Sequence, residues 1–267
     1  MTRDIRRVRT GGAEIAVHLQ GDGPALLFVH GFPLDHDLWR HQLRTFPGWW
    51  RIAPDLRGAG ASDAPEAGYS ISRYADDLVE VLDALEVAAA VVCGLSLGGY
   101  VVLELLRRHR SRVRAAVLCD TRAEADTEEG RHGRDTMITL AREGGPEAVA
   151  DRMIPSLLAA ATRAERPEVE GLVREMIGRT PVVGLVGALQ AMRDRVDSTP
   201  LLGELRLPVL VLAGAADAIT TPEAGAALAE KIKGARFATV AGAGHLPPLE
   251  QPFVTTRLIA DFLKAVL

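Results

Sequence analysis

The chain has 267 residues and a formal net charge of -4, with 48% hydrophobic and 25% charged residues. This length suits one large α/β domain with room for an insertion, and the composition is that of a globular protein. The slightly acidic balance gives no basic surface for nucleic acid, so we expect no nucleic-acid partner. No apolar run approaches the roughly 18 residues of a membrane span, and residues 1–7 lack the apolar core of a signal peptide. We therefore expect a cytoplasmic protein with no membrane partner.

The first part of the chain contains strand-like patterns. Residues 14–19 alternate between apolar and polar side chains, as a partly exposed strand does. Residues 25–29 are continuously apolar, which is typical of a parallel strand covered on both faces. They lead into His30-Gly31-Phe32-Pro33, at the carboxyl end of the strand, where parallel sheets place their catalytic loops. A helix is predicted over residues 35–46 by the spacing of its apolar side chains.

The next loop, residues 54–63, is rich in glycine. It lacks the Gly-x-Gly-x-x-Gly spacing of a nucleotide-binding loop, so we expect no nucleotide cofactor. Asp55 and Arg57 are predicted to pair and stiffen this loop. Residues 70–86 begin with serines that can cap a helix and carry apolar side chains on one stripe, which predicts an amphipathic helix.

Ser96 lies between a short apolar run and a stretch of helix-forming residues. The sequence Gly94-Leu95-Ser96-Leu97-Gly98 predicts a strand, a sharp turn and a helix, which is the order of a nucleophile elbow. The flanking glycines remove side chains that would collide at so strained a turn, and Gly99 lets the helix lie close to the strand. Such a motif alone also fits an ordinary glycine-rich turn. Ser96 is our candidate nucleophile, provided that partners exist elsewhere in the chain.

Strands and helices alternate as far as the predicted strand at 113–120, which indicates parallel βαβ units. From residue 122 to 199 no strand-like run occurs, and helical stretches start at Pro146, Pro167 and Pro181. We predict that residues 122–199 form a helical cap inserted into an α/β core made of residues 1–121 and 200–267.

The strand pattern resumes at residues 207–214 and 235–240. Asp217 lies just beyond the first of these strands, and His245 lies on a glycine-flanked loop after the second. With Ser96 they occur in the order serine, acid, histidine, which is the order of neither chymotrypsin-like nor subtilisin-like proteases. Because the carboxyl ends of parallel strands meet at one edge of the sheet, the three side chains can converge.

The chain resembles the α/β-hydrolase fold superfamily through His30-Gly31-Phe32-Pro33, Asp55-Leu56-Arg57-Gly58, Gly94-Leu95-Ser96-Leu97-Gly98-Gly99, Gly214-Ala215-Ala216-Asp217 and Gly242-Ala243-Gly244-His245. The resemblance covers both core segments. Within the superfamily the chain is most similar to the esterase and 3-oxoadipate enol-lactonase branch, through residues 30–35, 120–126 and 184–189. It implies a mostly parallel central sheet flanked by helices, with an inserted helical cap.

This resemblance implies hydrolysis of a small carboxylic ester or lactone through an acyl-enzyme intermediate. Ser96 would be the nucleophile and His245 the general base, oriented by Asp217. The backbone N–H groups of Phe32 and Leu97 would form the oxyanion hole.

A substrate pocket is predicted beside this site. Its candidate residues are His30, Asp120, Leu189, Met192 and Leu246. Asp120 also ends a strand, at a position where some superfamily members carry their acid. We expect the acid to be Asp217, and Asp120 to lie in a hydrogen-bond network or at the base of the cap.

Other reactions use the same three residues. Carbon–carbon bond hydrolases and cofactor-free haloperoxidases or perhydrolases are alternatives, and a non-catalytic ligand receptor of the same fold is a remote one. A serine at the elbow argues against haloalkane dehalogenases and epoxide hydrolases, whose families use aspartate there. Cys93 and Cys119 fall in apolar runs without a metal-binding spacing, so we expect buried thiols, no metal and no cofactor.

Overall fold

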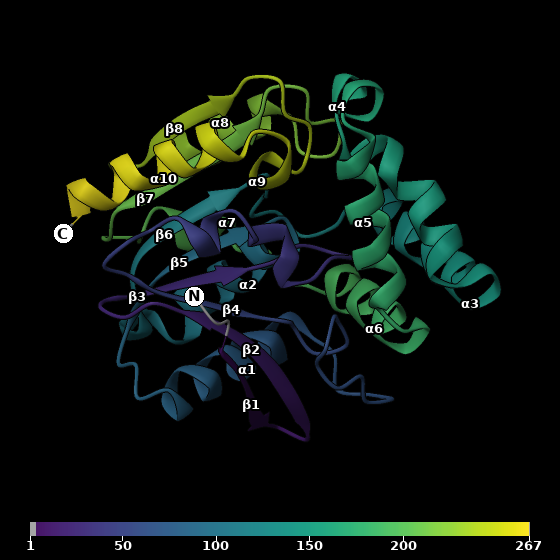
Figure 1. Cartoon of the computed structure of the whole chain (residues 1–267), viewed down its shortest axis with the longest axis horizontal. Coiled ribbons are helices and arrows are strands. Elements are labelled where there is room, and N and C mark those ends of the chain that lie inside the picture. The colour runs from purple at the N-terminus through teal and green to yellow at the C-terminus, as the bar shows by residue number, and fades with distance from the viewer. Residues whose placement is uncertain (1–3, 267) are drawn as a thin grey trace.

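The computed structural model describes residues 4–266. Within them, eight strands form one sheet in the order β1-β2-β4-β3-β5-β6-β7-β8 (Figure 1). The six strands from β4 to β8 in this order are parallel to one another, whereas β2 is antiparallel to both β1 and β4. The strands are β1 Asp4–Thr10, β2 Ala13–Gln20, β3 Ala25–Val29, β4 Trp50–Pro54, β5 Ala90–Leu95, β6 Val113–Cys119, β7 Val209–Gly214 and β8 Arg236–Val240. The predicted α/β class, with a mostly parallel sheet, is confirmed.

The middle of the sheet is the core of the molecule. Every residue of β3, β5 and β7 is buried, which is the reason for their continuous apolar sequences. At one edge of the sheet, β1 exposes its first four residues, and at the other β8 is largely exposed. Strand β1 has no visible strand pattern in the sequence, because a run of charged side chains hides that of an edge strand.

Helices cover the sheet. Helices α1 (Ile71–Ala84) and α2 (Leu97–Arg108) pack against each other, and α2 also lies along β5 and β6. Helix α8 (Pro222–Glu230) packs on β7, and α10 (Pro252–Val266) reaches β8. Shorter turns are η3 (Arg110–Arg112) and α7 (Thr199–Leu202). None of the helices in residues 4–266 is both long and apolar enough to cross a membrane.

Of the helices described between β6 and β7, the first four form what we call the helical segment. They are α3 (Glu128–Leu157), α4 (Ala160–Glu165), α5 (Pro167–Arg179) and α6 (Val182–Arg193), and they gather at the end of the molecule opposite the C-terminus (Figure 1). Helix α3 packs on α5 and α6, and it is kinked at Gly145, whose φ of 67° is not helical. The exact division into cap and core remains a prediction.

The prediction of one continuous helix over residues 35–46 is wrong. Two 3-10 turns stand in its place, η1 (His36–Trp39) and η2 (Gln42–Arg44). At the second turn a side chain binds the backbone. The guanidinium of the buried Arg51 donates to the carbonyl oxygen of Leu43 in η2, at 3.1 Å, and to that of Trp49 beyond it, at 2.8 Å.

Candidate active site

Ser96 lies where β5 ends and α2 begins. Its backbone has a φ of 53° and a ψ of -114°, a conformation that residues with a side chain rarely adopt. The Ser96 N–H donates to the Cys119 carbonyl oxygen at 2.9 Å, and the Thr121 hydroxyl donates to the Ser96 carbonyl oxygen at 2.9 Å. A Cβ on Gly98 would lie 2.3 Å from the Val29 carbonyl oxygen, so only glycine fits there. The strand, sharp turn and helix expected around Ser96 are therefore present.

Two backbone N–H groups belong to the surroundings of Ser96. Leu97 is the first residue of α2, and Phe32 follows Gly31, whose Cβ position lies only 3.3 Å from the Ser96 Cβ. In the described part of the chain, neither the Phe32 N–H nor the Leu97 N–H has a hydrogen-bond acceptor. Both are free to bind a negatively charged oxygen, and the N-terminus of α2 adds a favourable field at Leu97.

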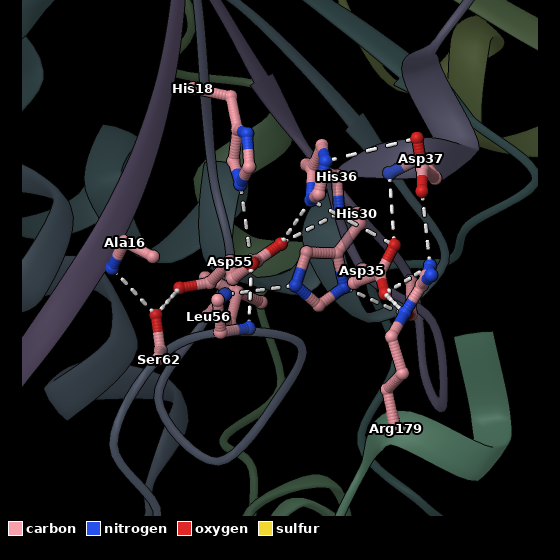
Figure 2. A network of polar contacts seen from close by, with 12 residues as sticks. Ala16, His18, His30, Asp35, His36, Asp37, Asp55, Leu56, Ser62 and Arg179 are labelled. Atoms are coloured by element: carbon pink, nitrogen blue, oxygen red, sulfur yellow. Dashed lines mark hydrogen bonds and ion pairs between the residues drawn. The ribbon is translucent and has the colours of Figure 1, made fainter. Parts of the chain in front are cut away.

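His30 connects two loops at this edge of the sheet (Figure 2). Its Nε2 accepts a hydrogen bond of 2.8 Å from the Leu56 N–H, and its Nδ1 donates to the Gly31 carbonyl oxygen at 2.9 Å. Burial lowers the pKa of His30, which agrees with a neutral ring that accepts at one nitrogen and donates at the other. Both ring nitrogens are thus bound within the protein, and they hold the loop that carries Phe32.

Asp55 and Arg57 do not pair with each other, contrary to the prediction. Asp55 Oδ1 accepts from the His36 Nδ1 at 2.8 Å and from the His36 backbone at 2.9 Å, while Oδ2 accepts from the Ala61 N–H (Figure 2). Arg57 instead makes hydrogen bonds of 2.8 and 2.9 Å to the two oxygens of Asp77 in α1. The reason is that Asp77 offers the planar, two-pronged fit that a guanidinium prefers, and the Asp55 carboxylate is already occupied.

The same network extends to the helical segment (Figure 2). Arg179, the last residue of α5, donates to Asp35 Oδ2 at 2.8 Å and to Asp37 Oδ2 at 3.0 Å. Asp35 is fully buried and follows the Phe32 loop directly. This ion pair therefore fastens the loop after β3 to α5.

His245 and Asp217 are joined by a hydrogen bond of 2.7 Å between Nδ1 and Oδ2, and both are buried. Asp217 Oδ1 accepts from the N–H groups of Ile219, at 2.7 Å, and Thr220, at 3.1 Å. Burial alone would raise the pKa of Asp217, but the hydrogen bond and charge of His245, with a contact from Asp120, hold it below its ordinary value. An ionised Asp217 fixes the proton on Nδ1 and leaves Nε2 of His245 free to accept one.

Asp120 lies beside Asp217, at the end of β6, with a positive φ of 46°. Its Oδ1 accepts from the Gly214 N–H at 2.7 Å, and the Cys119 thiol donates to its Oδ2 at 3.0 Å. Burial and the negative charge of Asp217 raise the pKa of Asp120 well above its usual value. These shifts favour a protonated Asp120 beside an ionised Asp217, whose Oδ2 accepts the hydrogen bond from His245 Nδ1.

A cavity of about 260 Å³ opens between the Phe32 loop and the helical segment. Its walls include Phe32, Ile219, Leu189, Met137 and Met153. Of the predicted pocket residues, Leu189 lines this cavity, whereas Met192 and Leu246 are buried and do not.

The cavity wall also carries charge that the sequence analysis did not assign. Asp126 binds two arginines, Arg134 at 3.0 Å and Arg195 at 2.6 Å. Arg122 makes no ion pair within residues 4–266, and its buried Nε has no hydrogen-bond partner. The wall therefore has excess positive charge. The signal in the sequence is the polar stretch 120–126 directly after a buried strand, at the edge of the sheet where Ser96 lies.

Two clusters within the described residues bring three possible metal ligands within 4.8 Å of one another: Asp120 with Asp217 and His245, and His18 with His36 and Asp55. In the first cluster, Asp217 is bound to an imidazole and two backbone N–H groups. In the second, Asp55 accepts from three donors, and the rings of His18 and His36 are stacked with centroids 3.2 Å apart. Parallel rings do not aim their nitrogens at one point, so these residues suit hydrogen-bonded networks better than metal ligation.

A comparison with known proteins agrees with this geometry. The model of the alpha/beta hydrolase fold family matches residues 24–252. The chain belongs to this family. It is a hydrolase, and its relatives include esterases and enol-lactonases.

Three relatives illustrate the similarity. A thermophilic esterase from Thermogutta terrifontis, solved with malate bound, is 38% identical with a TM-score of 0.95, over 98% of this chain and 99% of its own. The enol-lactonase from Burkholderia xenovorans LB400 is 28% identical with a TM-score of 0.91, over 97% of this chain and 100% of its own. The 3-oxoadipate enol-lactonase 2 of Acinetobacter baylyi is 28% identical, over 92% of this chain and 90% of its own.

Proposed function

We propose that this protein hydrolyses a small carboxylic ester or lactone by acyl transfer to Ser96. The observation that carries the proposal is the His245–Asp217 hydrogen bond, which lies at the same carboxyl edge of the sheet as the strained Ser96. The relatives support this reaction class, since those compared are named as esterases or enol-lactonases.

In the first step, the Ser96 Oγ attacks the substrate carbonyl carbon while His245 Nε2 takes the hydroxyl proton. The carbonyl oxygen becomes negative and binds the N–H groups of Phe32 and Leu97. The bond to the alcohol oxygen then breaks, and His245 gives its proton to that oxygen. Water repeats the sequence at the acyl-enzyme, which releases the carboxylic acid and restores Ser96.

The direct test is hydrolysis of p-nitrophenyl esters of increasing acyl length and of a lactone panel, comparing the wild type with Ser96→Ala. We expect turnover in the wild type and a loss of on the order of 1,000-fold or more in the variant. Turnover that survives Ser96→Ala would contradict the proposal. If neither protein hydrolyses these substrates while a fluorophosphonate labels Ser96, the nucleophile is active and the bond cleaved is another one, and peroxide-dependent halogenation is the next assay.

The acyl group of the substrate carries a carboxylate that binds Arg122. An arginine with a buried, unpartnered Nε on a cavity wall of excess positive charge favours an anionic ligand. Two of the relatives point the same way, because malate and 3-oxoadipate, named for them, are both dicarboxylates. Phe32 lines the same cavity, so a carboxylate held there belongs to a molecule long enough to reach the oxyanion site.

Arg122→Met tests this carboxylate subsite. A hydrogen-bonded ion pair with a charged partner contributes about 1.5–3 kcal/mol, so we expect kcat/KM for the p-nitrophenyl monoester of glutaric acid to fall about 10- to 100-fold. The neutral valerate ester should change less than about threefold. Arg142→Met, on the exposed face of α3, is the matched control. Equal losses on both esters would show that Arg122 supports the fold and does not select the substrate.

A further inference from the structure

Glu250 is a fully buried acid in the loop that carries His245, at the end of α9 (Pro247–Glu250). Its Oε1 accepts hydrogen bonds from the Gly244 N–H at 2.8 Å and from the Leu246 N–H at 3.1 Å. A single oxygen therefore holds the backbone on both sides of His245. Glu250 belongs to none of the predicted site residues; its signal in the sequence is an acid within an otherwise apolar, proline-rich stretch.

The other oxygen of this carboxylate binds the helical segment. Oε2 accepts from the Ala159 N–H at 2.8 Å and from the Thr162 hydroxyl at 2.8 Å, where α3 ends and α4 begins. Two further contacts join the same regions. The His245 N–H donates to the Leu157 carbonyl oxygen at 3.0 Å, and a Cβ on Gly244 would lie only 2.6 Å from the Ala159 nitrogen. The histidine loop is thus attached to the junction of α3 and α4.

We propose that Glu250 is a positioning residue for the reaction: it fixes the backbone of His245, and it makes the placement of that histidine depend on the α3–α4 junction. The inference rests on the proposed function, in which His245 moves a proton to and from Ser96. Asp217 sets the direction of the imidazole ring, while Glu250 sets the position of the loop from which the ring projects.

The chemistry of the carboxylate makes this role specific. Two oxygens that only accept are matched by four donors, three backbone N–H groups and one hydroxyl. Glutamine has nearly the same shape, but its NH2 group would face donors on one side, and a backbone N–H cannot reverse its polarity. Because a shift of about 1 Å in a catalytic group can lower a rate by about 100-fold, a small movement of the loop is measurable.

Glu250→Gln is the first test. We expect kcat per active site, with sites counted by fluorophosphonate titration, to fall about 10- to 100-fold, while KM changes less than about twofold. The rate of fluorophosphonate labelling should fall in parallel, because it also needs His245. Glu165→Gln makes the same chemical change at an exposed position of α4 and should match the wild type. A lower melting temperature with an unchanged kcat per site would overturn the proposal and leave Glu250 a purely structural residue.

Thr162→Val removes only the hydroxyl donor and keeps the three backbone donors, so it tests the link if Glu250→Gln does not fold. The readout is the downfield proton resonance of the His245 Nδ1–H, which reports its 2.7 Å hydrogen bond to Asp217 without any substrate. We expect this resonance to shift or broaden in Thr162→Val and to remain unchanged in Glu165→Gln. An unchanged resonance in Thr162→Val would contradict a link between the helical segment and His245.

These outcomes separate the two proposals. If the wild type hydrolyses esters through Ser96 and both variants keep kcat and the resonance, the positioning role fails and the proposed function stands. If the wild type hydrolyses none of the substrates, the proposed function fails, and the resonance in Thr162→Val still decides whether the α3–α4 junction positions His245.

Discussion

Two buried carboxyl groups lie side by side next to His245, and they differ in charge because their surroundings differ. Asp217 has the imidazole and two backbone N–H groups as partners, which favours its ionised form. Asp120 has one backbone N–H, a thiol and the negative charge of its neighbour, which favours its protonated form. Only the ionised partner can stabilise an imidazolium, so the two residues have separate roles.

Substitution by asparagine separates these roles. Asp217→Asn should lower kcat on the order of 1,000-fold or more, because the amide cannot stabilise the charged ring of His245. Asp120→Asn should keep kcat within about threefold, since an amide reproduces a protonated acid and asparagine tolerates the φ of 46°. Steady-state hydrolysis of one p-nitrophenyl ester checks both. The reverse pattern would make Asp120 the acid of the site.

The raised pKa of Asp120 also predicts how stability depends on pH. Its pKa is raised in the folded state, so its stabilising contribution is complete below the unfolded value of 3.8 and is lost as pH rises from there toward the folded pKa. The slope is at most about 1.4 kcal/mol per pH unit. The pKa of Asp217 is lowered in the folded state, so its contribution to stability is lost only as pH falls below about 3.8.

We therefore expect Asp120→Asn to gain stability over the wild type between pH 4 and 7. Urea unfolding at intervals of one pH unit measures the difference, and Asp217→Asn serves as the comparison. A constant difference across this range would show that Asp120 is ionised in the folded protein.

The residues that sequence reasoning could name are those whose backbone surroundings are unusual. Ser96, Asp217 and His245 each follow a strand and stand next to glycine or in a short loop, and they form a motif in the sequence. Arg122 and Glu250 have no such motif, because their roles come from what other segments do or do not place beside them. Arg122 lacks an ion-pair partner among residues 4–266, and Glu250 has four donors, two of which come from a distant helical region.

At the scale of secondary structure, the arginine at the end of α5 attaches this helix to the loop after β3. Arg179 is partly exposed, but its partner Asp35 is fully buried and lies next to the Phe32 loop. Loss of the arginine would leave that carboxylate with the Asp37 N–H, at 2.9 Å, and a contact of 3.9 Å to the His36 Nδ1. The Arg179–Asp35 ion pair therefore supports both the stability of the fold and the position of the Phe32 loop.

We expect Arg179→Met to lower the free energy of unfolding by about 1–2 kcal/mol, a value reduced from that of a buried pair because the guanidinium is partly in water. It should also lower kcat, since the Phe32 loop loses a support. Arg174→Met on the same helix removes only solvent-accessible ion pairs, with Glu147, Asp151 and Glu170, and should cost less than about 1 kcal/mol. Urea unfolding compares the two variants. Similar losses of unfolding free energy would mean that the burial of Asp35 does not strengthen its ion pair with Arg179.

Element prediction succeeded where burial imposes a pattern and failed where it does not. The continuous apolar runs of β3, β5 and β7 follow from coverage on both faces. Strand β1 lies at an edge and is full of arginine, so no period of two is visible in its sequence. The η2 turn is bound by Arg51, which comes later in the chain and takes the Leu43 carbonyl group. The local sequence pattern of residues 35–46 does not reveal such a partner.

At the scale of the whole molecule, the sheet buries both cysteines. Cys93 and Cys119 lie in adjacent strands, both fully buried, and burial raises the pKa of each thiol. Neither is within reach of a reagent unless the sheet opens. Their reactivity therefore reports the unfolding of the core as a unit.

In native buffer we expect both thiols to resist iodoacetamide and to become labelled together, with a urea dependence equal to that of global unfolding. Mass spectrometry of peptides labelled at increasing urea concentrations makes the comparison, and the fully unfolded protein gives the reference rate. A thiol that reacts in native buffer, at a rate independent of urea, would reveal a local opening of β5 or β6.

The helical segment leaves the sheet after β6 and returns at β7, and these strands are neighbours: Cys119 pairs with Leu212. The two ends of the excursion therefore lie next to each other, so its length can change without rethreading any strand. Such an arrangement is modular. A segment exchanged between relatives would bring new cavity walls to an unchanged serine, provided that the grafted piece also supplies the groups that meet Asp35 and Glu250. Chimeras made with and without those polar groups would distinguish residues that set substrate specificity from residues that the grafted segment needs to fold onto the core.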